Sequence, residues 1–576
     1  MRTEMMTYKR TNNHGAERRI VWMLLLGLFA ILPLSGQPAW VKKATKAVFT
    51  LKTFNANGSL LASSTGFFTN ADGEAVSCFS PFRGASSAVV IDAQGKEWPV
   101  ECMLGANDTY DVAKFRVAAK KTTALTIATA TEPEGASVWL LPYHENKNCP
   151  KGTVNKSELF KARSFDGDYT YYTIAIAMGE NAIGTPLMNT TGEVIGLMQQ
   201  PASPTDSLNY AVSARYADSL RITGLSLNDQ TLQSTYIKKD LPKAAEQAQL
   251  MLYLASNGDS TTFVIIIEQF IEKFPTEPDG YIYRAQLRTG DQLFAEAAAD
   301  MEQAIKVAEK KDEAHFSYAK LIYNKELLMP DVPYDGWSLD KALEEARKAE
   351  QINPLDVYRH EQAVILFAQK KWRESYDIYT TLFQGNMRSP ELFYEASRCQ
   401  QQLGDSAAVL ALLDSCVAMF QKPYLKEAAP YLLVRANTAI DYKRYRQAVL
   451  DLNEYEQLMA ASVNDQFYFL RYQASLNGRQ YQQALNDIDR AITMSPRNDL
   501  YYSEKASLQV RVGQYEEALE TAKQCIEVAP SHSDGYLFLG LAQCLKGQKA
   551  EGVKNLQKAK ELGDDQADGL IEKYGK

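Results

Sequence analysis

Hydrophobic and polar residues are patterned in two different ways along the chain. Between about residue 40 and residue 225, short runs rich in β-branched and aromatic residues are separated by turn sequences such as Asn70-Ala-Asp-Gly73. We expect strands over nine of these runs: Val48–Phe54, Gly66–Thr69, Ala75–Phe79, Ala88–Asp92, Pro99–Leu104, Val112–Val117, Ser137–Tyr143, Tyr171–Ala177 and Val194–Met198. Many short strands at close spacing predict an all-β barrel or sandwich.

From about residue 240 onward the hydrophobic period becomes helical, and the pattern recurs at a fixed interval. Tyr481 and Tyr515 are 34 residues apart (515 − 481 = 34). The same interval separates Ala484 from Ala518, Pro496 from Pro530, Ala491 from Cys525, and Cys525 from Ala559. Small residues at these positions predict close contact between two antiparallel helices, and the prolines predict the end of each second helix.

This second region resembles the tetratricopeptide repeat family over roughly residues 240 to 576. About eight repeats fit, with an insertion around Leu327–Trp337. The resemblance implies a superhelix whose concave face binds peptides or other proteins and carries no chemistry of its own. Helix position marks Ser503, Ser507 and Arg511 as candidate binding residues on that face.

The N-terminus has the layout of a secretory signal peptide. Basic residues precede an uncharged apolar run, Ile20 to Leu32, which Pro33 ends. The run is shorter than the about 20 residues that span a bilayer. We therefore expect a signal peptide over residues 1–36 and a mature chain that begins at Gln37. Leu34, at the third position before the expected cut, is not ideal for cleavage, so an uncleaved membrane anchor is the alternative.

The composition and the absence of certain motifs argue against several classes of ligand. The 576 residues carry a net charge of −8, which gives no electrostatic route to nucleic acid. The seven cysteines include no C-x-x-C pair, so the usual zinc and redox signatures are absent, and no disulfide is established. Nucleotide and EF-hand motifs are also missing. We expect neither a metal nor a cofactor.

The β-rich region resembles the trypsin-like serine proteases, most closely the bacterial HtrA branch. The similarity lies in seven stretches: Ser64-Thr-Gly-Phe-Phe68, Asp72-Gly-Glu-Ala-Val-Ser-Cys-Phe-Ser80, Arg83-Gly-Ala85, Gly105-Ala-Asn-Asp-Thr-Tyr-Asp-Val-Ala113, Gly184-Thr-Pro-Leu-Met-Asn189, Gly192-Glu-Val-Ile-Gly196 and Asn209-Tyr-Ala-Val-Ser213. The resemblance implies a double β-barrel over residues 37–236, followed by the helical array over 237–576. The expected fold class is thus multidomain, with an all-β unit before an all-α solenoid.

The resemblance also locates the catalytic triad, and the sequence departs from it there. Ser80 occupies the position of the base histidine, Asp111 that of the aspartate and Ile183 that of the nucleophile. Two glycines of the loop that forms the oxyanion hole are replaced by Asn181 and Thr185. Isoleucine has no nucleophilic atom, and a serine at the base position cannot accept and return a proton near neutral pH.

A check that needs no alignment supports the loss of the triad. The trypsin-like order along the chain is His, then Asp, then Ser. No histidine lies between His14, in the signal region, and His144. The mature chain therefore has no histidine before Asp111, and His144 falls in an expected loop.

These observations favour an exported, non-catalytic scaffold in the periplasm or cell envelope of a bacterium. Its partners would be proteins or peptides, not nucleic acid, with no transmembrane segment after signal cleavage. The alternative is an active trypsin-like endopeptidase whose repeats recruit substrates. A third possibility is a structural member of an envelope assembly, in which the β unit only caps the array.

Overall fold

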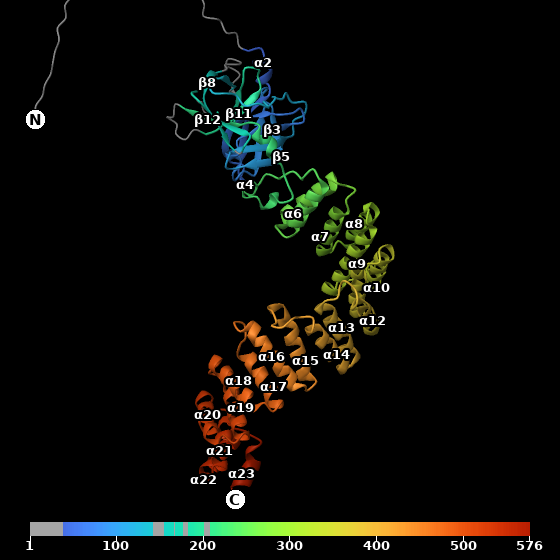
Figure 1. Cartoon of the computed structure of the whole chain (residues 1–576), viewed down its shortest axis with the longest axis vertical. Coiled ribbons are helices and arrows are strands. Elements are labelled where there is room, and N and C mark those ends of the chain that lie inside the picture. The colour runs from blue at the N-terminus through green and yellow to red at the C-terminus, as the bar shows by residue number, and fades with distance from the viewer. Residues whose placement is uncertain (1–37, 142–154, 166, 177–181, 201–207, 576) are drawn as a thin grey trace, which may run out of the picture. The chain divides into compact units, whose positions relative to one another are not determined.

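The computed structural model describes residues 38–141, 155–165, 167–176, 182–200 and 208–575. The expected signal peptide, His144 and Asn181 lie outside these ranges. The chain forms two compact units, Met1–Arg284 and Ala285–Lys576, and each is described by itself. The first unit contains the strands and the second contains most of the helices (Figure 1).

The strands of the first unit close into two six-stranded antiparallel barrels. The first barrel has the strand order β1-β2-β3-β6-β5-β4 and the second has the order β10-β11-β12-β9-β8-β7. Their bounds are β1 Val48–Phe54, β2 Leu60–Phe68, β3 Glu74–Ser77, β4 Ser87–Ile91, β5 Glu97–Asn107, β6 Val112–Val117, β7 Ser137–Leu140, β8 Asn155–Phe165, β9 Tyr169–Ile174, β10 Pro186–Met188, β11 Val194–Met198 and β12 Asn209–Ser213. The all-β double barrel expected from the sequence is therefore confirmed.

Short helices and turns complete the first unit. They are α2 Val41–Ala44, η1 Ser80–Phe82, α3 Tyr216–Ser219, η2 Ser226–Asn228 and α4 Gln230–Gln233, followed by the longer helices α5 Ala245–Ser256 and α6 Ser260–Lys273. Within the first barrel, the rings of Phe49, Phe68 and Phe115 pack at centroid distances of 4.8 and 6.3 Å. Gly66 is required beside them, because a side chain there would meet the Phe49 ring.

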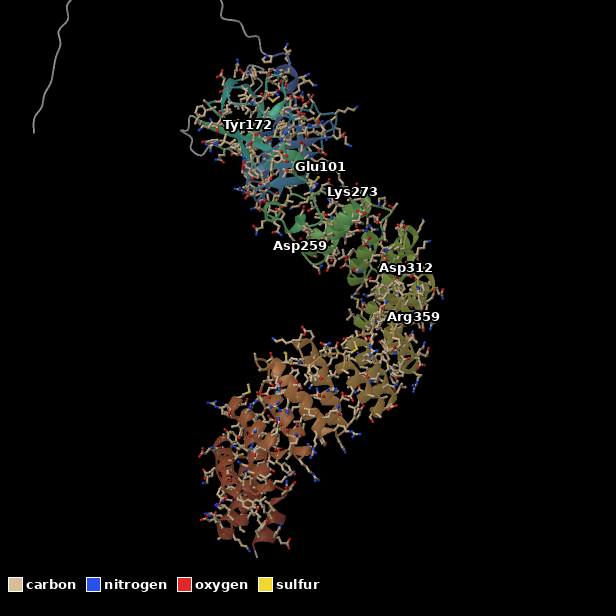
Figure 2. All side chains as sticks on the ribbon, in the orientation of Figure 1. Glu101, Tyr172, Asp259, Lys273, Asp312 and Arg359 are labelled. Atoms are coloured by element: carbon tan, nitrogen blue, oxygen red, sulfur yellow. The ribbon has the colours of Figure 1, made fainter. Side chains whose placement is uncertain are left out.

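The segment after the second barrel returns to the first barrel and anchors the first helices. The amide of Met103 donates to the Lys238 carbonyl, and the amide of Asp240 donates to the Met103 carbonyl. The Asp240 carboxylate then pairs with Arg116 at 3.2 Å and with Lys273 at 3.3 Å. Lys273 is labelled in Figure 2. Helices α5 and α6 thus belong structurally to the first unit.

The second unit is built of helices that pack against their neighbours along the chain, such as α9 with α10 and α21 with α22, and its first helix, α7, begins in the first unit. Their bounds are α7 Pro278–Gly290, α8 Phe294–Val307, α9 Lys311–Leu328, α10 Leu339–Ile352, α11 Asp356–Ala368, α12 Trp372–Leu382, α13 Pro390–Leu403, α14 Ser406–Val417, η3 Lys426–Ala428, α15 Ala429–Asp441, α16 Tyr445–Met459, α17 Asp465–Asn477, α18 Tyr481–Met494, α19 Asp499–Arg511, α20 Tyr515–Val528, α21 Ser533–Leu545, α22 Lys549–Glu561 and α23 Ala567–Tyr574. This arrangement confirms the expected all-helical region.

The repeated small residues lie where the helices touch. Ala484, Ala491, Ala518, Cys525 and Ala559 are all at most 1% exposed. The predicted insertion is a loop between α9 and α10, and Trp337 anchors it by donating from Nε1 to the Tyr318 hydroxyl at 3.0 Å. Within the described residues, none of the helices combines the length and the apolar character that crossing a bilayer requires.

Candidate functional site

The two positions that the sequence assigns to the triad's base and aspartate meet at the end of strand β3. Ser80 begins the short η1 turn, and the Thr53 hydroxyl fixes that turn by donating to the Pro81 carbonyl at 2.6 Å. Asp111 lies in the β5–β6 turn with a left-handed φ of 51°. In the same turn the amide of Tyr110 donates to the Asn107 side chain at 2.8 Å. Both turns are therefore held by side-chain hydrogen bonds.

Both oxygens of the Asp111 carboxylate accept hydrogen bonds from Ser80. Its Oδ1 accepts from the Ser80 backbone amide at 2.6 Å, and its Oδ2 accepts from the Ser80 hydroxyl at 3.1 Å. In a triad this carboxylate orients an imidazole, which then carries the proton between nucleophile and leaving group. Here it orients a hydroxyl, whose pKa lies too far from neutrality for that exchange. The two residues that the sequence assigns to the base and aspartate positions are therefore in direct contact.

The loop at the nucleophile position is fixed from the first barrel. The Thr65 amide donates to the Ile183 carbonyl at 2.8 Å, and the Gly184 amide donates to the Met198 carbonyl at 2.7 Å. Gly184 has a φ of 81°, and a side chain there would overlap the Thr65 carbonyl oxygen. The Ile183 side chain packs, partly buried, against the hydrophobic cluster that contains Cys78. The position thus presents a hydrocarbon side chain.

Cys78 belongs to the hydrophobic cluster against which Ile183 packs. It is fully buried, and its Sγ donates to the Met198 carbonyl at 3.3 Å. Burial, with the charge of Asp111 as a further cause, raises the pKa of the Cys78 thiol well above its ordinary value. The thiolate is the reactive form of cysteine, so this thiol is protonated and inert at neutral pH.

Gln199 bridges the two barrels beside the triad positions. Its Nε2 donates to the Tyr110 carbonyl at 2.5 Å, and its Oε1 accepts from the Tyr171 hydroxyl. The Tyr110 ring packs on Phe165 at 4.5 Å, and burial raises the pKa of Tyr171. Sequence reasoning did not identify this bridge, because neither glutamine nor tyrosine at these positions carries a catalytic signature.

The candidate binding residues of the array lie on one helix, α19, but differ in access. Ser503 is 4% exposed, and its hydroxyl donates to the Leu500 carbonyl of its own helix at 3.0 Å. Ser507 is half-buried and Arg511 is exposed. Of the three, Arg511 is therefore the residue that a ligand reaches most directly.

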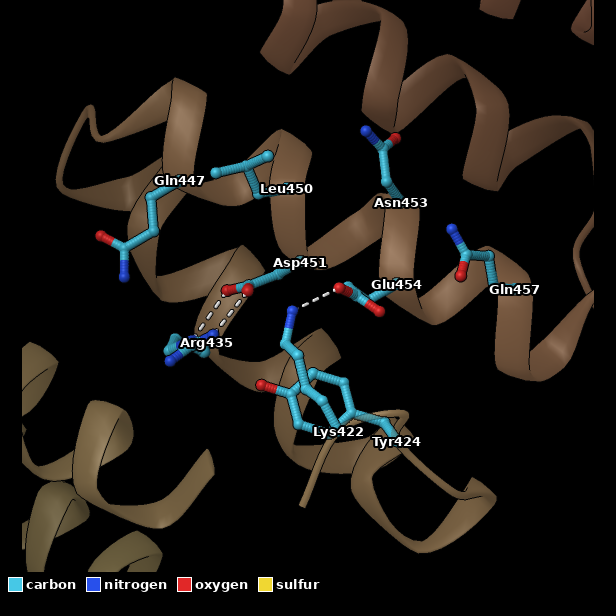
Figure 3. Close-up of a pocket in the computed structure, with 9 residues that line it drawn as sticks. All are labelled: Lys422, Tyr424, Arg435, Gln447, Leu450, Asp451, Asn453, Glu454 and Gln457. Carbon is cyan, nitrogen blue, oxygen red and sulfur yellow. Dashed lines mark hydrogen bonds and ion pairs between the residues drawn. The ribbon is translucent and has the colours of Figure 1, made fainter. Parts of the chain in front are cut away.

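The array also contains two hollows, and one of them reaches α19 through Glu504. The first has a volume of about 380 Å³ and is lined by Lys422, Tyr424, Arg435, Gln447, Leu450, Asp451, Asn453, Glu454 and Gln457 (Figure 3). Its charges are paired: Lys422 bonds Glu454 at 2.6 Å, and Arg435 bonds Asp451 through two nitrogens. Because both cations already have carboxylate partners, this hollow has little capacity to bind a charged ligand.

The second hollow, of about 360 Å³, mixes apolar and amide side chains. It is lined by Ile440, Tyr445, Leu470, Tyr472, Gln473, Ala474, Leu476, Asn477 and Glu504. Tyr472 donates from its hydroxyl to Glu504 at 2.7 Å, while Gln473 and Asn477 are exposed. Among the residues that the structure describes, no three His, Cys, Asp or Glu side chains gather into a group that could hold a metal ion.

Comparison with known proteins agrees with the fold of the first unit. The family model of the trypsin-like peptidase domain matches residues 64–197. A second family model, that of anaphase-promoting complex subunit 5, matches residues 468–545 in the helical array. A search of curated proteins finds no match. The first unit thus has a trypsin-like peptidase fold, and the residues after it form an all-helical region.

Solved structures with similarity to the chain include three proteases. The serine endoprotease from Yersinia pestis is 18% identical, covers 31% of this chain and 62% of its own length, and has a TM-score of 0.27. An active-form protease from M. tuberculosis is 18% identical over 32% of this chain and 85% of its own, with a TM-score of 0.26. The HtrA-type protease AlgW with a tripeptide is 17% identical over 31% and 60%, with a TM-score of 0.26. The chain thus matches less than two thirds of the length of the first of these proteins.

Proposed function

We propose that the protein is an exported, non-catalytic scaffold for protein–protein interaction. In this proposal, residues 1–36 are a signal peptide, residues 37–236 form a pseudoprotease domain and residues 237–576 form a tetratricopeptide array. The observation that carries the proposal is the contact between Ser80 and Asp111. It leaves the aspartate with a serine hydroxyl in place of a base, while Ile183 stands in place of a nucleophile.

The second hollow of the array supports the binding role. Exposed amides of Gln473 and Asn477 lie beside the apolar side chains of Leu470 and Leu476. Amide groups can bond the backbone of an extended peptide, and an apolar recess can take one of its side chains. This combination suits a peptide segment better than a small charged metabolite. Arg511 on the neighbouring helix α19 would add a contact to the same ligand.

The alternative function is that of an active trypsin-like endopeptidase whose array recruits substrates. It is favoured by the trypsin-like fold and by the retained Asp111. It would need a proton acceptor from elsewhere, because no histidine precedes Asp111 in the expected mature chain. A structural role in an envelope assembly is a third proposal, in which the array contacts neighbouring proteins permanently.

Affinity capture tests the binding role. The mature protein, residues 37–576, is used to capture partners from its own envelope fraction, and mass spectrometry identifies them. A soluble protein or peptide that binds again after purification would support the scaffold. The matched variant Gln473→Ala with Leu476→Ala should weaken that binding, because it removes an amide and an apolar contact from the hollow. Recovery only within a large membrane-associated complex would favour the structural role.

Peptide mapping of the exported protein tests the expected export. A first peptide that begins at Gln37 would support cleavage, whereas an intact segment from Met1 to Pro38 would support an anchor.

A further inference from the structure

One carboxylate oxygen in the described part of the array is buried without a hydrogen-bond donor. Glu361, on α11, is 8% exposed, and its Oε1 is buried with no partner among the residues that the structure describes. Burying an acceptor that has lost water and gained no donor costs free energy. Folded proteins retain such a group where it serves a purpose, so the environment of Glu361 indicates what could supply the donor.

The groups around Glu361 come from the helices that pack on α11. Lys320 and His360 act electrostatically to lower its pKa, Glu395 acts to raise it, and burial dominates, so that the pKa of Glu361 is raised. The Glu395 carboxylate on α13 accepts from His360 Nε2 at 2.7 Å. The charges of Glu361 and Glu395 both contribute to the raised pKa of Tyr323 on α9. The faces of α9, α11 and α13 therefore meet around two carboxylates.

Lys320 and His360, the two basic groups whose charges act on Glu361, contact other partners. The Lys320 ammonium lies over the Phe316 ring at 5.4 Å, and His360 bonds Glu395. Neither of them has a hydrogen bond to Glu361 within the described part of the chain. Glu361 Oε1 therefore has basic groups in its surroundings but no direct hydrogen-bond donor.

Aromatic rings complete the surroundings. Tyr323 is half-buried, and Tyr379 packs edge-on to the His360 ring at 5.9 Å. Aromatic faces attract a desolvated cation and therefore complement a carboxylate in binding one. Figure 2 labels Asp312 on α9 and Arg359 on α11, the two helices that bound this region on one side. Asp312 already accepts from Asn353 and Tyr358, so it does not compete for the same donor.

We propose that the faces of α9, α11 and α13 bind a basic side chain, lysine or arginine, of a partner peptide, with Glu361 as the acceptor. The proposal rests on the peptide-binding function proposed above and specifies the chemistry of one position of the peptide. An ammonium or guanidinium group would supply the N–H that Glu361 lacks, and charge-assisted hydrogen bonds of this kind are strong. Glu395 and the tyrosine rings would hold the same cation.

Selection from a library of short random displayed peptides tests the proposal. The targets are the mature chain, its Glu361→Gln variant and a Glu374→Gln control, whose exposed side chain lies in the first turn of α12. Peptides selected on the wild type and on the control should share a lysine or arginine at one aligned position. Peptides selected on Glu361→Gln should lose that preference. Circular dichroism of each variant verifies that the array is folded.

One selected peptide and its lysine-to-alanine analogue give the quantitative test. The analogue should bind the wild type at least about tenfold more weakly and should bind Glu361→Gln with the same affinity as the parent peptide. A basic preference that persists in Glu361→Gln, or binders without any basic position, would overturn this inference and leave the scaffold function standing. Failure of every target to select a peptide would contradict both the inference and the peptide-binding function.

Discussion

The carboxylate of Asp111 accepts hydrogen bonds from both polar groups of Ser80, from the amide at 2.6 Å and from the hydroxyl at 3.1 Å. This contact joins the two positions that the sequence assigns to the base and the aspartate of a triad, with serine at the base position. Asp111 thereby acquires a structural role, because it fixes the η1 turn to the β5–β6 turn.

Replacement of Asp111 should loosen this part of the first barrel. Asp111→Ala removes both acceptors and places alanine at a φ of 51°, so we expect a loss of about 1–3 kcal/mol in local stability. Asp111→Asn keeps one acceptor and a residue that tolerates this φ, so it should lose less. Amide hydrogen exchange of the segment around Ser80 measures both effects. Equal exchange rates in the wild type and Asp111→Ala would show that the contact between Ser80 and Asp111 does not stabilise this segment.

Gly184 should be intolerant of a side chain. Gly184→Ala would bring a Cβ into the Thr65 carbonyl oxygen at a φ of 81°, and we expect a loss of about 3 kcal/mol or more. Gly135→Ala is the matched control, since Gly135 has a φ of 78° but no atom within 4 Å of the added carbon. Its cost should be the backbone strain alone, about 1–2 kcal/mol.

Urea unfolding of the first unit, followed by tryptophan fluorescence, measures this pair. Equal destabilisation by the two alanine variants would mean that the loop at Gly184 can move away from β2.

The sequence predicts the residues of this site that belong to a linear motif, and it misses those that depend on contacts between distant segments. The residues that flank Ser80 and Asp111 follow the linear pattern of the trypsin-like serine proteases, so the sequence assigns both residues to one site. The Gln199 bridge was missed because it depends on which side chains meet across two barrels, and no spacing along the chain reports that. Ser503 was chosen by helix position, but its burial depends on packing against neighbouring helices.

The same distinction holds for the fold. Strands β1, β6 and β11 have the predicted bounds because apolar and β-branched residues mark both of their ends. Strand β8 was missed because it is exposed along most of its length, with Leu159 as its one fully buried side chain among those described. Strand β10 has three residues, too few to show a period.

Glu361→Gln should stabilise the unliganded array at neutral pH. Burial raises the pKa of Glu361 above 4.5, so the folded protein binds this proton more tightly than the unfolded chain does. The folded state is therefore favoured at low pH, and that contribution is lost as the pH rises through the raised pKa. Glutamine carries no such penalty, so the variant should gain about 1–3 kcal/mol above that pKa and nothing well below 4.5.

Urea unfolding followed by circular dichroism, between about pH 4 and about pH 8, measures this difference. The groups that face Glu361 are present in both proteins: Lys320, Tyr323, His360 and Glu395. In both proteins the hydrogen bond to Glu395 raises the pKa of His360, so the contribution of His360 to stability is present below 6.5 and is lost as the pH rises through the raised value. The charge of Glu361 is a smaller cause of that raised pKa, and Glu361→Gln removes it, so this part of the contribution differs between the two proteins. A gain that does not depend on pH would contradict the assignment to Glu361, and Glu374→Gln should show no gain.

Restoring the triad side chains should not restore a protease. Ser80→His with Ile183→Ser supplies a base and a nucleophile next to Asp111. Thr185 and Asn181 still replace the glycines of the oxyanion loop, and loss of one oxyanion donor alone costs about 10²–10³ in rate. We expect activity at the detection limit of a fluorogenic peptide assay. Robust hydrolysis would show that only the triad had been lost.

Turnover of a mixed peptide library by the purified mature protein is the most direct test of the central claim. With Ser80 at the base position and Ile183 at the nucleophile position, the wild type should cleave no peptide bond above the rate of an Asp111→Ala variant. Mass spectrometry of the library before and after incubation gives the measurement. Cleavage that persists through purification and disappears in Asp111→Ala would contradict the account.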